Sequence, residues 1–130
     1  MVSFPGDRRY TRDHHWVRVS GGIATIGITD YAQRQVGEVF AVELAQPDAP
    51  IKSDDGFGSL VCDSGVIEVV TPVAGAIVEV NDVLTVSPSI INEDPYGEGW
   101  MVRVRAPVSS ELDGLMSSET YAMYVAFVDA

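Results

Sequence analysis

Short apolar runs that alternate with polar residues recur along most of the chain, and turns rich in glycine and proline separate them. Residues 16–19 and 23–28 are the clearest pair, because Ser20-Gly21-Gly22 between them is typical of the turn of a β-hairpin. The same alternation predicts further strands at residues 38–44, 57–62, 66–70, 76–81 and 100–105. Many short strands constrain the chain to a mainly β fold, either a sandwich or a flattened barrel.

Several serine and threonine residues are placed to begin short helices between and after these strands. Because such side chains cap the first helical turn, we expect N-caps at Thr29, at Ser87, at Ser109 or Ser110, and at Ser118. Gly37 is expected to end the first helix, and Pro88 suits the first helical position after Ser87. The sequence therefore predicts small helices on a β core, with C-terminal helices at its end.

A turn at Asp63-Ser64-Gly65 joins two of the predicted strands. Aspartate and glycine on either side of a serine favour a tight, exposed hairpin in which Gly65 takes a positive φ. The strand that follows, at residues 76–81, is expected to join this hairpin as a third partner.

The length and composition of the chain fit a single domain. With 130 residues, of which 46% are hydrophobic and 21% charged, the chain can bury one apolar core. No linker interrupts it. We expect an N-terminal tail at residues 1–9, one domain at residues 10–130, and a monomer.

Charge excludes several classes of partner. Asp and Glu number 19 against 8 Lys and Arg, a net charge of -11 that opposes binding to nucleic acid or to an anionic membrane. No run approaches the roughly 18 apolar residues of a membrane span, and residues 1–7 do not have the basic start and apolar stretch expected of a signal peptide. Cys62 is the only cysteine, so no internal disulfide calls for an oxidising compartment. We expect a cytoplasmic protein.

Long stretches of the chain resemble the glycine cleavage system H-protein family. The matching residues, in order, are 10–14, 16–17, 24–33, 37–38, 42–44, 72–75, 79–81 and 91–100. The run Asn-Glu-Asp-Pro-Tyr-Gly-Glu-Gly-Trp at residues 92–100 is specific through its length alone. The resemblance implies a barrel-sandwich hybrid fold, like that of lipoyl and biotinyl carriers, and a carrier that is not an enzyme.

The family's carrier chemistry depends on a lysine at a hairpin tip. As the resemblance implies, that lysine bears lipoate and shuttles an aminomethyl group between glycine decarboxylase, the aminomethyltransferase and lipoamide dehydrogenase. The family tip reads Glu-Ser-Val-Lys-Ala, and an ungapped alignment places there Val61, Cys62, Asp63, Ser64 and Gly65. Ser64 thus takes the place of the lipoyl-lysine but has no primary amine. The only lysine, Lys52, lies in a different turn, so we expect no lipoate or other cofactor at this tip.

A second departure concerns the cleft that holds the loaded arm in the family. Family members commonly have glutamate at the position of His15, and its carboxylate is thought to hold the ammonium group of the arm. His15, whether neutral or cationic, cannot do so. Thr11 and Glu68 match the polar and acidic positions near the cleft, so the resemblance implies only a partial loss.

We expect neither catalytic nor metal-binding residues. Ser64 could be a nucleophile, but an exposed turn rarely supplies the base that it needs. Cys62 could be a reactive thiol, but a lone strand cysteine is more often a small apolar filler. His14 and His15 are adjacent, so on a strand their side chains would point to opposite faces and would not chelate a metal.

These features leave alternative functions open. We favour a non-lipoylated H-protein paralogue that acts as a binding or regulatory module for glycine-cleavage or lipoate-handling enzymes. The alternative is a genuine aminomethyl carrier, modified at a non-standard residue such as Lys52. An enzyme that uses Cys62 or Ser64 is disfavoured, because no Ser-His-Asp, metal-ligand or phosphate-binding spacing supports it.

Overall fold

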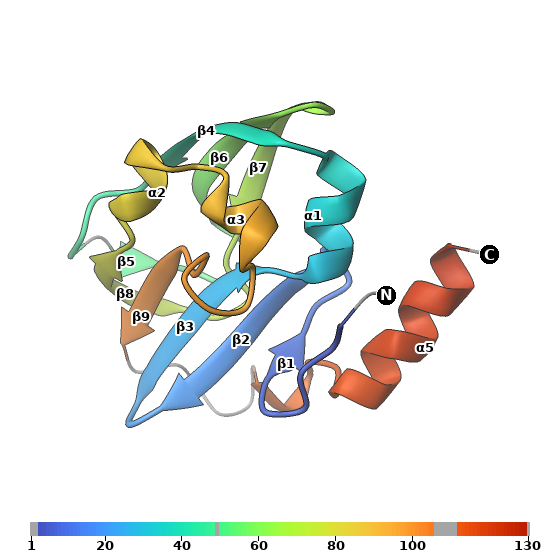
Figure 1. Ribbon diagram of the computed structural model, residues 1–130. Helices are drawn as coiled ribbons and strands as arrows, with labels where there is room; N and C mark the ends of the chain where they lie inside the picture. Colours follow the sequence, from blue (N-terminus) through green and yellow to red (C-terminus); the bar gives the residue numbers. More distant parts are fainter. Residues whose placement is uncertain (1–2, 49, 106–111, 130) are drawn as a thin grey trace.

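The computed structural model describes residues 3–48, 50–105 and 112–129 and contains two antiparallel sheets with small helices around them (Figure 1). The larger sheet has the order β1-β2-β3-β9-β8-β5, with bounds Arg9–Tyr10, His15–Ser20, Ile23–Ile28, Val102–Arg105, Gly75–Val80 and Pro50–Ile51. The smaller sheet has the order β4-β6-β7, with bounds Val39–Leu44, Gly56–Cys62 and Gly65–Val70. The predicted mainly β fold with small helices is confirmed.

Alternate side chains of the two sheets fill one apolar core. Ile26 and Val104 come from the larger sheet and Leu60 and Val69 from the smaller one, and none is more than 1% exposed. Because alternate residues of a strand point to opposite faces, this core accounts for the period of two in the sequence.

The first turns and helix follow the sequence prediction. Gly21 and Gly22 turn β2 into β3 with φ angles of 58° and 77°, values that favour glycine. Thr29 caps α1 (Asp30–Val36), because its side-chain oxygen accepts a hydrogen bond from a main-chain N–H of the first turn. Gly37 ends the helix with a φ of 80°. Both predicted ends of this helix are confirmed.

The predicted cap at Ser87 is wrong. Ser87 instead closes α2 (Val83–Val86), a helix that the sequence did not predict, because its N–H donates to the Val83 carbonyl at 2.8 Å. The next helix, α3 (Ile90–Glu93), begins after Ser89.

The last helix, α5 (Ser118–Val128), is capped one residue earlier than predicted. The hydroxyl oxygen of Ser117, not that of Ser118, accepts a hydrogen bond from the Thr120 N–H at 3.2 Å. The other predicted caps, Ser109 and Ser110, lie outside the described residues.

β8 does not extend the β6–β7 hairpin, as the sequence predicted, but crosses to the larger sheet between β9 and β5. The buried Thr71 hydroxyl donates to the Val73 carbonyl at 2.7 Å and turns the chain between the sheets. At Gly75 a Cβ would collide with the main chain of Arg105 on β9, so glycine lets the two strands pair closely. The crossing leaves β7 at an edge of the smaller sheet.

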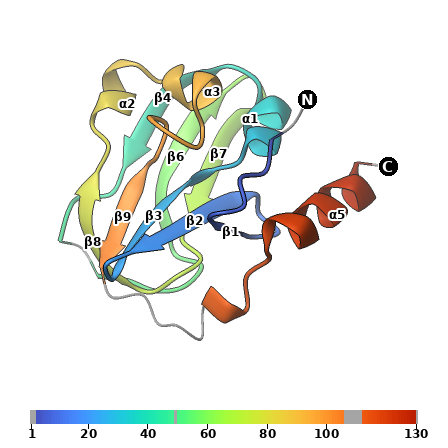
Figure 2. The same ribbon diagram turned by 60° about the horizontal axis from the view of Figure 1, so that its bottom comes forward.

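α5 packs outside the larger sheet and reaches the residues that position α1 (Figure 2). Tyr121 stacks on Tyr10, with ring centroids 4.7 Å apart. Its hydroxyl lies 2.7 Å from the Thr29 hydroxyl oxygen and 2.9 Å from Nδ1 of His14. None of the helices among the described residues is long and apolar enough to cross a membrane.

The first described residues also lie against the domain. Phe4 meets the Tyr121 ring edge-on at 5.3 Å, and the Arg8 guanidinium lies 4.6 Å from the centre of the Trp16 ring. The division into a tail at residues 1–9 and a domain at residues 10–130 stays a prediction.

Candidate functional site: the hairpin tip and the adjoining cleft

The tip of the β6–β7 hairpin is fixed to the junction between α1 and β4. The N–H of Asp63 donates to the Glu38 carbonyl at 3.1 Å, and the Glu38 N–H donates to the Asp63 carboxylate at 2.8 Å. The N–H of Ser64 donates to the Val36 carbonyl at 3.1 Å. Hairpin tips are usually mobile, but these hydrogen bonds hold the backbone of this tip in one place.

Gly37 makes this close approach possible. Its φ of 80° lies in the region that favours glycine. A Cβ built at Gly37 would lie 2.6 Å from Oδ2 of Asp63, which is closer than real atoms approach. The residue that the sequence predicts as a helix stop therefore also leaves space for the tip.

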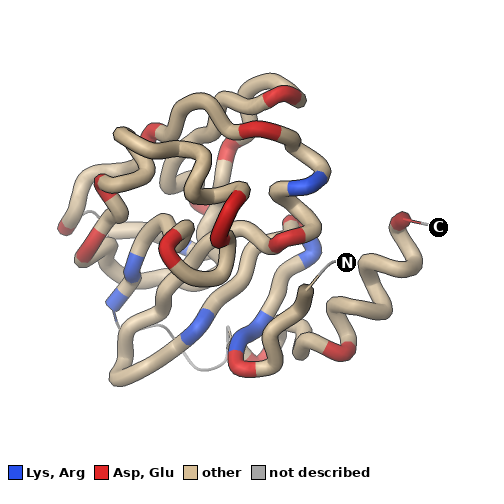
Figure 3. Tube along the Cα trace, viewed as in Figure 1, with Lys and Arg blue, Asp and Glu red and all other residues tan. Residues whose placement is uncertain are grey.

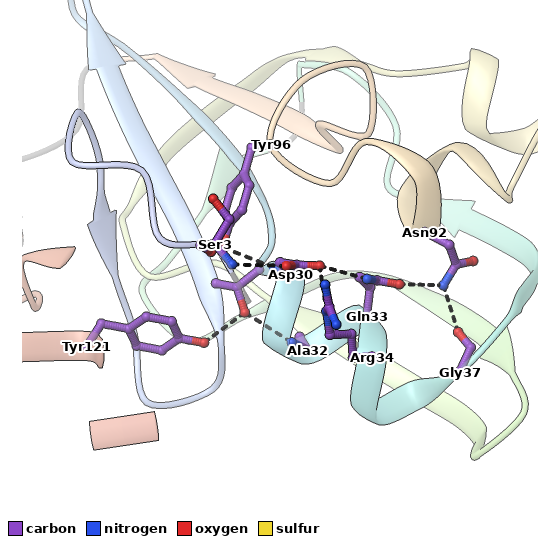
Figure 4. A network of polar contacts seen from close by, with 10 residues as sticks. Ser3, Asp30, Ala32, Gln33, Arg34, Gly37, Asn92, Tyr96 and Tyr121 are labelled. Carbon is purple, nitrogen blue, oxygen red and sulfur yellow. Dashed lines mark hydrogen bonds and ion pairs between the residues drawn. The ribbon is translucent and has the colours of Figure 1, made fainter. Parts of the chain in front are cut away.

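Asn92 holds the same junction from its other side (Figure 4). Its amide nitrogen donates to the Gly37 carbonyl at 2.8 Å and to the Gln33 side chain at 3.0 Å. Its oxygen accepts a hydrogen bond from the Val39 N–H at 2.9 Å. This gives a physical role to the first residue of the specific run at residues 92–100.

Ser64 is exposed, and its hydroxyl oxygen lies 3.2 Å from the carbonyl oxygens of both Gln35 and Val36. One hydroxyl proton serves one of these acceptors at a time. Because a carbonyl oxygen is not a general base, these partners do not activate Ser64 as a nucleophile. The hydroxyl instead binds carbonyl groups that the end of a helix leaves unpaired.

Cys62 points into the core and is only 5% exposed. Its sulfur lies 3.2 Å from the Gly65 carbonyl oxygen, across the turn. Reactive cysteines are partly exposed and lie in electropositive surroundings. The burial of Cys62 fits the interpretation of a small apolar filler.

The tip does not fit the amide attachment of a lipoyl group. Amide formation needs a primary amine, and Cys62, Asp63, Ser64 and Gly65 offer a buried thiol, a hydrogen-bonded carboxylate and a hydroxyl. Lys52 lies in the turn between β5 and β6, which is the opposite end of β6 from the tip.

A cleft of about 490 Å³ lies beside the tip, between α1, the start of β2 and β7, the edge strand. Its apolar wall consists of Ile28, Ala32, Val36, Leu60, Ile67, Val69 and Val70. Its polar groups are Asp13, His14, His15, Gln35, Asp54 and Glu68. A cleft of this size suits a small ligand or a long flexible side chain. Because Gln35 and Val36 belong both to the cleft wall and to the tip contacts, a side chain at position 64 begins next to the cleft.

His15 is the most buried polar group of the cleft, with 4% of its surface exposed. Neither ring nitrogen has a hydrogen-bond partner among the described residues. Burial lowers the pKa of His15 to about 4, although Asp13 acts in the opposite direction through its charge and backbone. The sequence left the charge state of His15 open, and the structure makes it neutral at physiological pH.

The structure brings together some of the predicted cleft residues and not others. His15 and Glu68 line the cleft, whereas Thr11 lies behind it, where its hydroxyl oxygen accepts a hydrogen bond from the His15 N–H at 3.1 Å. His14 is not on the strand as expected, because its φ of 64° places it in the turn before β2. His14 and His15 therefore line the same cleft rather than opposite faces of a strand.

Sequence reasoning missed Asp13 and Asp54, which also line the cleft. Asp54 has a φ of 71° and belongs to a turn rich in aspartate, but its distance from the tip along the chain hid its position. An aspartate in a sequence can indicate a turn, but it does not indicate which cleft the turn faces. Only the fold shows that.

A two-sheet β domain with a rigid hairpin tip beside an apolar cleft is a carrier domain of the barrel-sandwich type, which is not a catalyst. Residues 8–127 match the family model described as Glycine cleavage H-protein, and the chain belongs to this family. The predicted family and fold are confirmed.

Relatives and a solved structure agree with this assignment. The glycine cleavage system H protein of Anaeromyxobacter sp. (strain K) is 41% identical over 124 residues, which cover 95% of this chain and 97% of the relative. That of Rubrobacter xylanophilus is 44% identical over 122 residues, or 94% of each chain. The crystal structure of a glycine cleavage system H protein from Mycobacterium marinum is 30% identical, covers 94% of this chain and 98% of its own, and has a TM-score of 0.84.

Proposed function

We propose that this chain is a non-lipoylated H-protein paralogue, which acts as a binding or regulatory module for glycine-cleavage or lipoate-handling enzymes. The observation that carries the proposal is the tip, where Ser64 presents a hydroxyl and its neighbours offer no amine. The tip backbone is held in place and the cleft lies beside it, and both support the proposal that the chain still binds these enzymes. We infer that His15 and Glu68 belong to the cleft that holds the arm in lipoylated relatives, with Thr11 positioning His15 from behind.

The relatives favour a second candidate function more directly, because they are named as the glycine cleavage system H protein itself. In this case the chain is a genuine aminomethyl carrier in glycine decarboxylation, and lipoate is attached at a non-standard residue. Lys52 is the only lysine and is exposed. Asp54, in the same turn, lines the cleft, so an arm on Lys52 would start near that end of the cleft.

Intact-mass analysis after co-expression with a lipoate ligase and added lipoate distinguishes the two candidates. We expect the unaltered chain and the Lys52→Arg variant to keep their unmodified masses. The Ser64→Lys variant restores an amine at the tip and is expected to gain one lipoyl group, which shows that the ligase is active. If the unaltered chain gains a lipoyl group that Lys52→Arg does not, the carrier candidate replaces our proposal.

We infer a cytoplasmic monomer whose partners are proteins of the glycine cleavage or lipoate pathway, and not nucleic acid or membranes. The net charge of -11 supports the exclusion of polyanionic partners. Pull-down with purified glycine decarboxylase, aminomethyltransferase, lipoamide dehydrogenase and lipoate ligase at physiological salt tests the docking role. If none of these enzymes is retained, the module is not a docking component of this system. Sedimentation analysis tests the monomer.

A further inference from the structure

The outer face of the larger sheet carries arginines in a chain that is otherwise strongly acidic. Arg18 on β2 and Arg103 on β9 each pair directly with Thr25 on β3, so the three side chains form one row. This row faces away from the core, because the adjacent residues Ile26 and Val104 point into it. Figure 3 shows basic positions on β2 and β9, whereas acidic positions follow β4 and the hairpin tip. The larger sheet therefore gathers positive charge on its outer face.

A hollow of about 240 Å³ lies over this row, and we call it the arginine hollow. It shares no described residue with the cleft beside the hairpin tip. A space of this size suits a small ion or a short acid rather than a larger ligand. Its walls include three aromatic rings and three charged groups, which are Trp16, Tyr96 and Trp100, and Arg18, Glu98 and Arg103.

Hydrogen bonds hold the aromatic walls of the arginine hollow in place. The buried Asn81 donates from its side-chain amide to the carbonyl oxygens of Glu98 and Trp100, at 2.8 Å each. The indole N–H of Trp16 donates to the Pro95 carbonyl at 2.9 Å. Walls that are fixed before a ligand arrives lose little conformational freedom when it binds.

Arg103 is oriented by three contacts of its guanidinium. The group lies 4.0 Å from the centre of the Trp100 ring, and its Nη1 donates to the Glu79 carboxylate at 2.6 Å. Its Nε lies 3.4 Å from the Thr25 hydroxyl oxygen. A guanidinium has five N–H donors, so these two hydrogen bonds leave donors for a ligand.

Arg18 has a charge that no described side chain pairs with. The residue is exposed, and no hydrogen bond or ion pair joins its guanidinium to any residue that the structure describes. The carboxylate of Asp7 is near enough to interact with the charge of Arg18, but it accepts a hydrogen bond from Arg8 at 2.9 Å. In a chain with 19 acidic residues, Arg18 thus keeps its donors available for an anion from solution.

We propose that the arginine hollow binds a small oxyanion, which is a phosphate or carboxylate group of a soluble molecule. The planar guanidinium groups of Arg18 and Arg103 match the paired oxygens of such a group. Glu98 opposes an anion from the rim, but one carboxylate against two guanidinium groups leaves the lining positive. The inference goes beyond the proposed function, because it uses neither the hairpin tip nor its cleft.

The net charge of -11 does not prevent such binding. Salt screens charges that are more than about 8 Å away at physiological ionic strength, so the nearest groups decide whether a small anion is bound. A polyanion such as nucleic acid would reach beyond the arginine hollow to the acidic surface around it. The proposed ligand is therefore a small anion and not an extended one.

The test titrates inorganic phosphate and, separately, succinate into the isotopically labelled full chain at pH 7.5 and constant ionic strength. NMR follows the indole N–H of Trp100 and the main-chain amides of residues 96–100. The central variant is Arg18→Gln, since Arg18 has no described contact to lose. Its matched control is Lys52→Gln, which removes the same charge from the turn between β5 and β6. Circular dichroism and urea unfolding check that each variant folds.

A second pair of variants changes the charge in the opposite sense. Glu98→Gln removes the carboxylate at the rim of the arginine hollow, and Glu119→Gln removes an exposed carboxylate on α5. Because the carboxylate of Glu98 repels an anion in the hollow, its removal should strengthen binding, whereas removal of Glu119 should have little effect.

We expect the shifts to saturate with at least one of the two anions. Arg18→Gln should weaken binding about tenfold, which corresponds to about 1.4 kcal/mol, and Lys52→Gln less than twofold. Glu98→Gln should bind roughly threefold more tightly than the unaltered chain. Stronger binding of phosphate would identify a phosphate group as the ligand, and stronger binding of succinate a carboxylate.

Two results would overturn the inference. Shifts that stay linear up to about 50 mM of both anions would show only weak association with the whole surface. Equal effects of Arg18→Gln and Lys52→Gln would show that the charge of the chain, and not the arginine hollow, attracts the anion. The proposed function would stand in either case, because lipoylation and enzyme binding test it separately.

Discussion

The carboxylate of Asp63 accepts a hydrogen bond from the last main-chain N–H before β4, at 2.8 Å from the nitrogen of Glu38. The two residues also share a main-chain hydrogen bond, from the Asp63 N–H to the Glu38 carbonyl. A side chain from the hairpin thus completes the hydrogen bonding of a segment that precedes it by the strands β4, β5 and β6. This relation fixes where the tip points.

Replacing Asp63 should loosen the tip without unfolding the domain. Asp63→Ala removes the acceptor for the Glu38 N–H, and loss of one such capping interaction costs about 1 kcal/mol of unfolding free energy. Urea unfolding measures this loss, and amide relaxation of residues 62–65 should report faster motion. Asp63→Asn retains an acceptor oxygen and should behave like the unaltered chain. Equal stability and equal tip dynamics in Asp63→Ala would contradict this account.

Gly37→Ala should destabilise the domain for two separable reasons. A residue with Cβ is strained at a φ of 80°, and the Cβ also meets Asp63 at 2.6 Å. We expect a loss of about 2 kcal/mol, of which only the backbone part should persist in the Asp63→Gly background, because alanine at position 63 would keep the Cβ that lies 2.7 Å from the added atom. Gly21→Ala is the matched control, since its φ is 58° and nothing lies within 4 Å of an added Cβ. Additive effects of Gly37→Ala and Asp63→Gly would rule out the steric contact.

Asn92→Ala should cost more than a surface substitution. It removes two donors that reach Gly37 and Gln33 and one acceptor for the Val39 N–H. Leaving partly buried main-chain groups unpaired costs roughly 2 kcal/mol or more. Asn92→Asp keeps the acceptor but not the donors and should fall between. The midpoints of urea unfolding, compared at a constant dependence of the unfolding free energy on urea, provide the measurement. A loss under about 0.5 kcal/mol would contradict the role of Asn92 in holding the α1–β4 junction.

His15 should make stability fall as the solution becomes acidic. In the folded protein the pKa of His15 is lowered from 6.5 to about 4, so below pH 6.5 the unfolded chain takes up a proton that the folded chain does not. The stabilisation is complete above pH 6.5, is lost as the pH falls towards 4, and amounts to about 3 kcal/mol at most.

The difference between the unaltered chain and His15→Phe isolates this effect from the titration of carboxylates. Phenylalanine keeps a ring near Phe57, which His15 now meets at 6.3 Å. Stability of the variant should vary less between pH 7 and pH 4.5, and NMR titration of the His15 ring in the unaltered chain should give a pKa well below 6.5. A His15 that titrates at its ordinary pKa would remove the basis of the prediction.

Local sequence signals were sufficient for the turns and caps that depend on one or two residues. Gly21, Gly22 and Gly37 take positive φ angles, which glycine adopts without strain, and Thr29 caps α1 by accepting a hydrogen bond from its first turn. Both requirements are local to the backbone. Adjacent candidates such as Ser117 and Ser118 are locally equivalent. Only the packing of α5, through Tyr121, decides which of them becomes the cap.

Contacts between segments that are distant along the chain could not be predicted from the sequence. The crossing of β8 to the larger sheet depends on the fit of Gly75 against Arg105, which no local pattern reveals. The charge state of His15 depends on how deeply it is buried, and the place of Asp54 in the cleft depends on the fold. Family resemblance supplied the tip and His15 as positions of interest, and the structure supplied their partners.

The main-chain hydrogen bond from Ser64 to Val36 does not depend on which side chain stands at position 64. A lineage can therefore gain or lose a modified residue there by a single substitution, without refolding the hairpin and with little penalty in stability. The fold therefore preserves the exposed position of the tip, while the side chain at position 64 decides whether a group can be attached there. Homologues that differ at this one site are expected to be structurally alike and functionally divided.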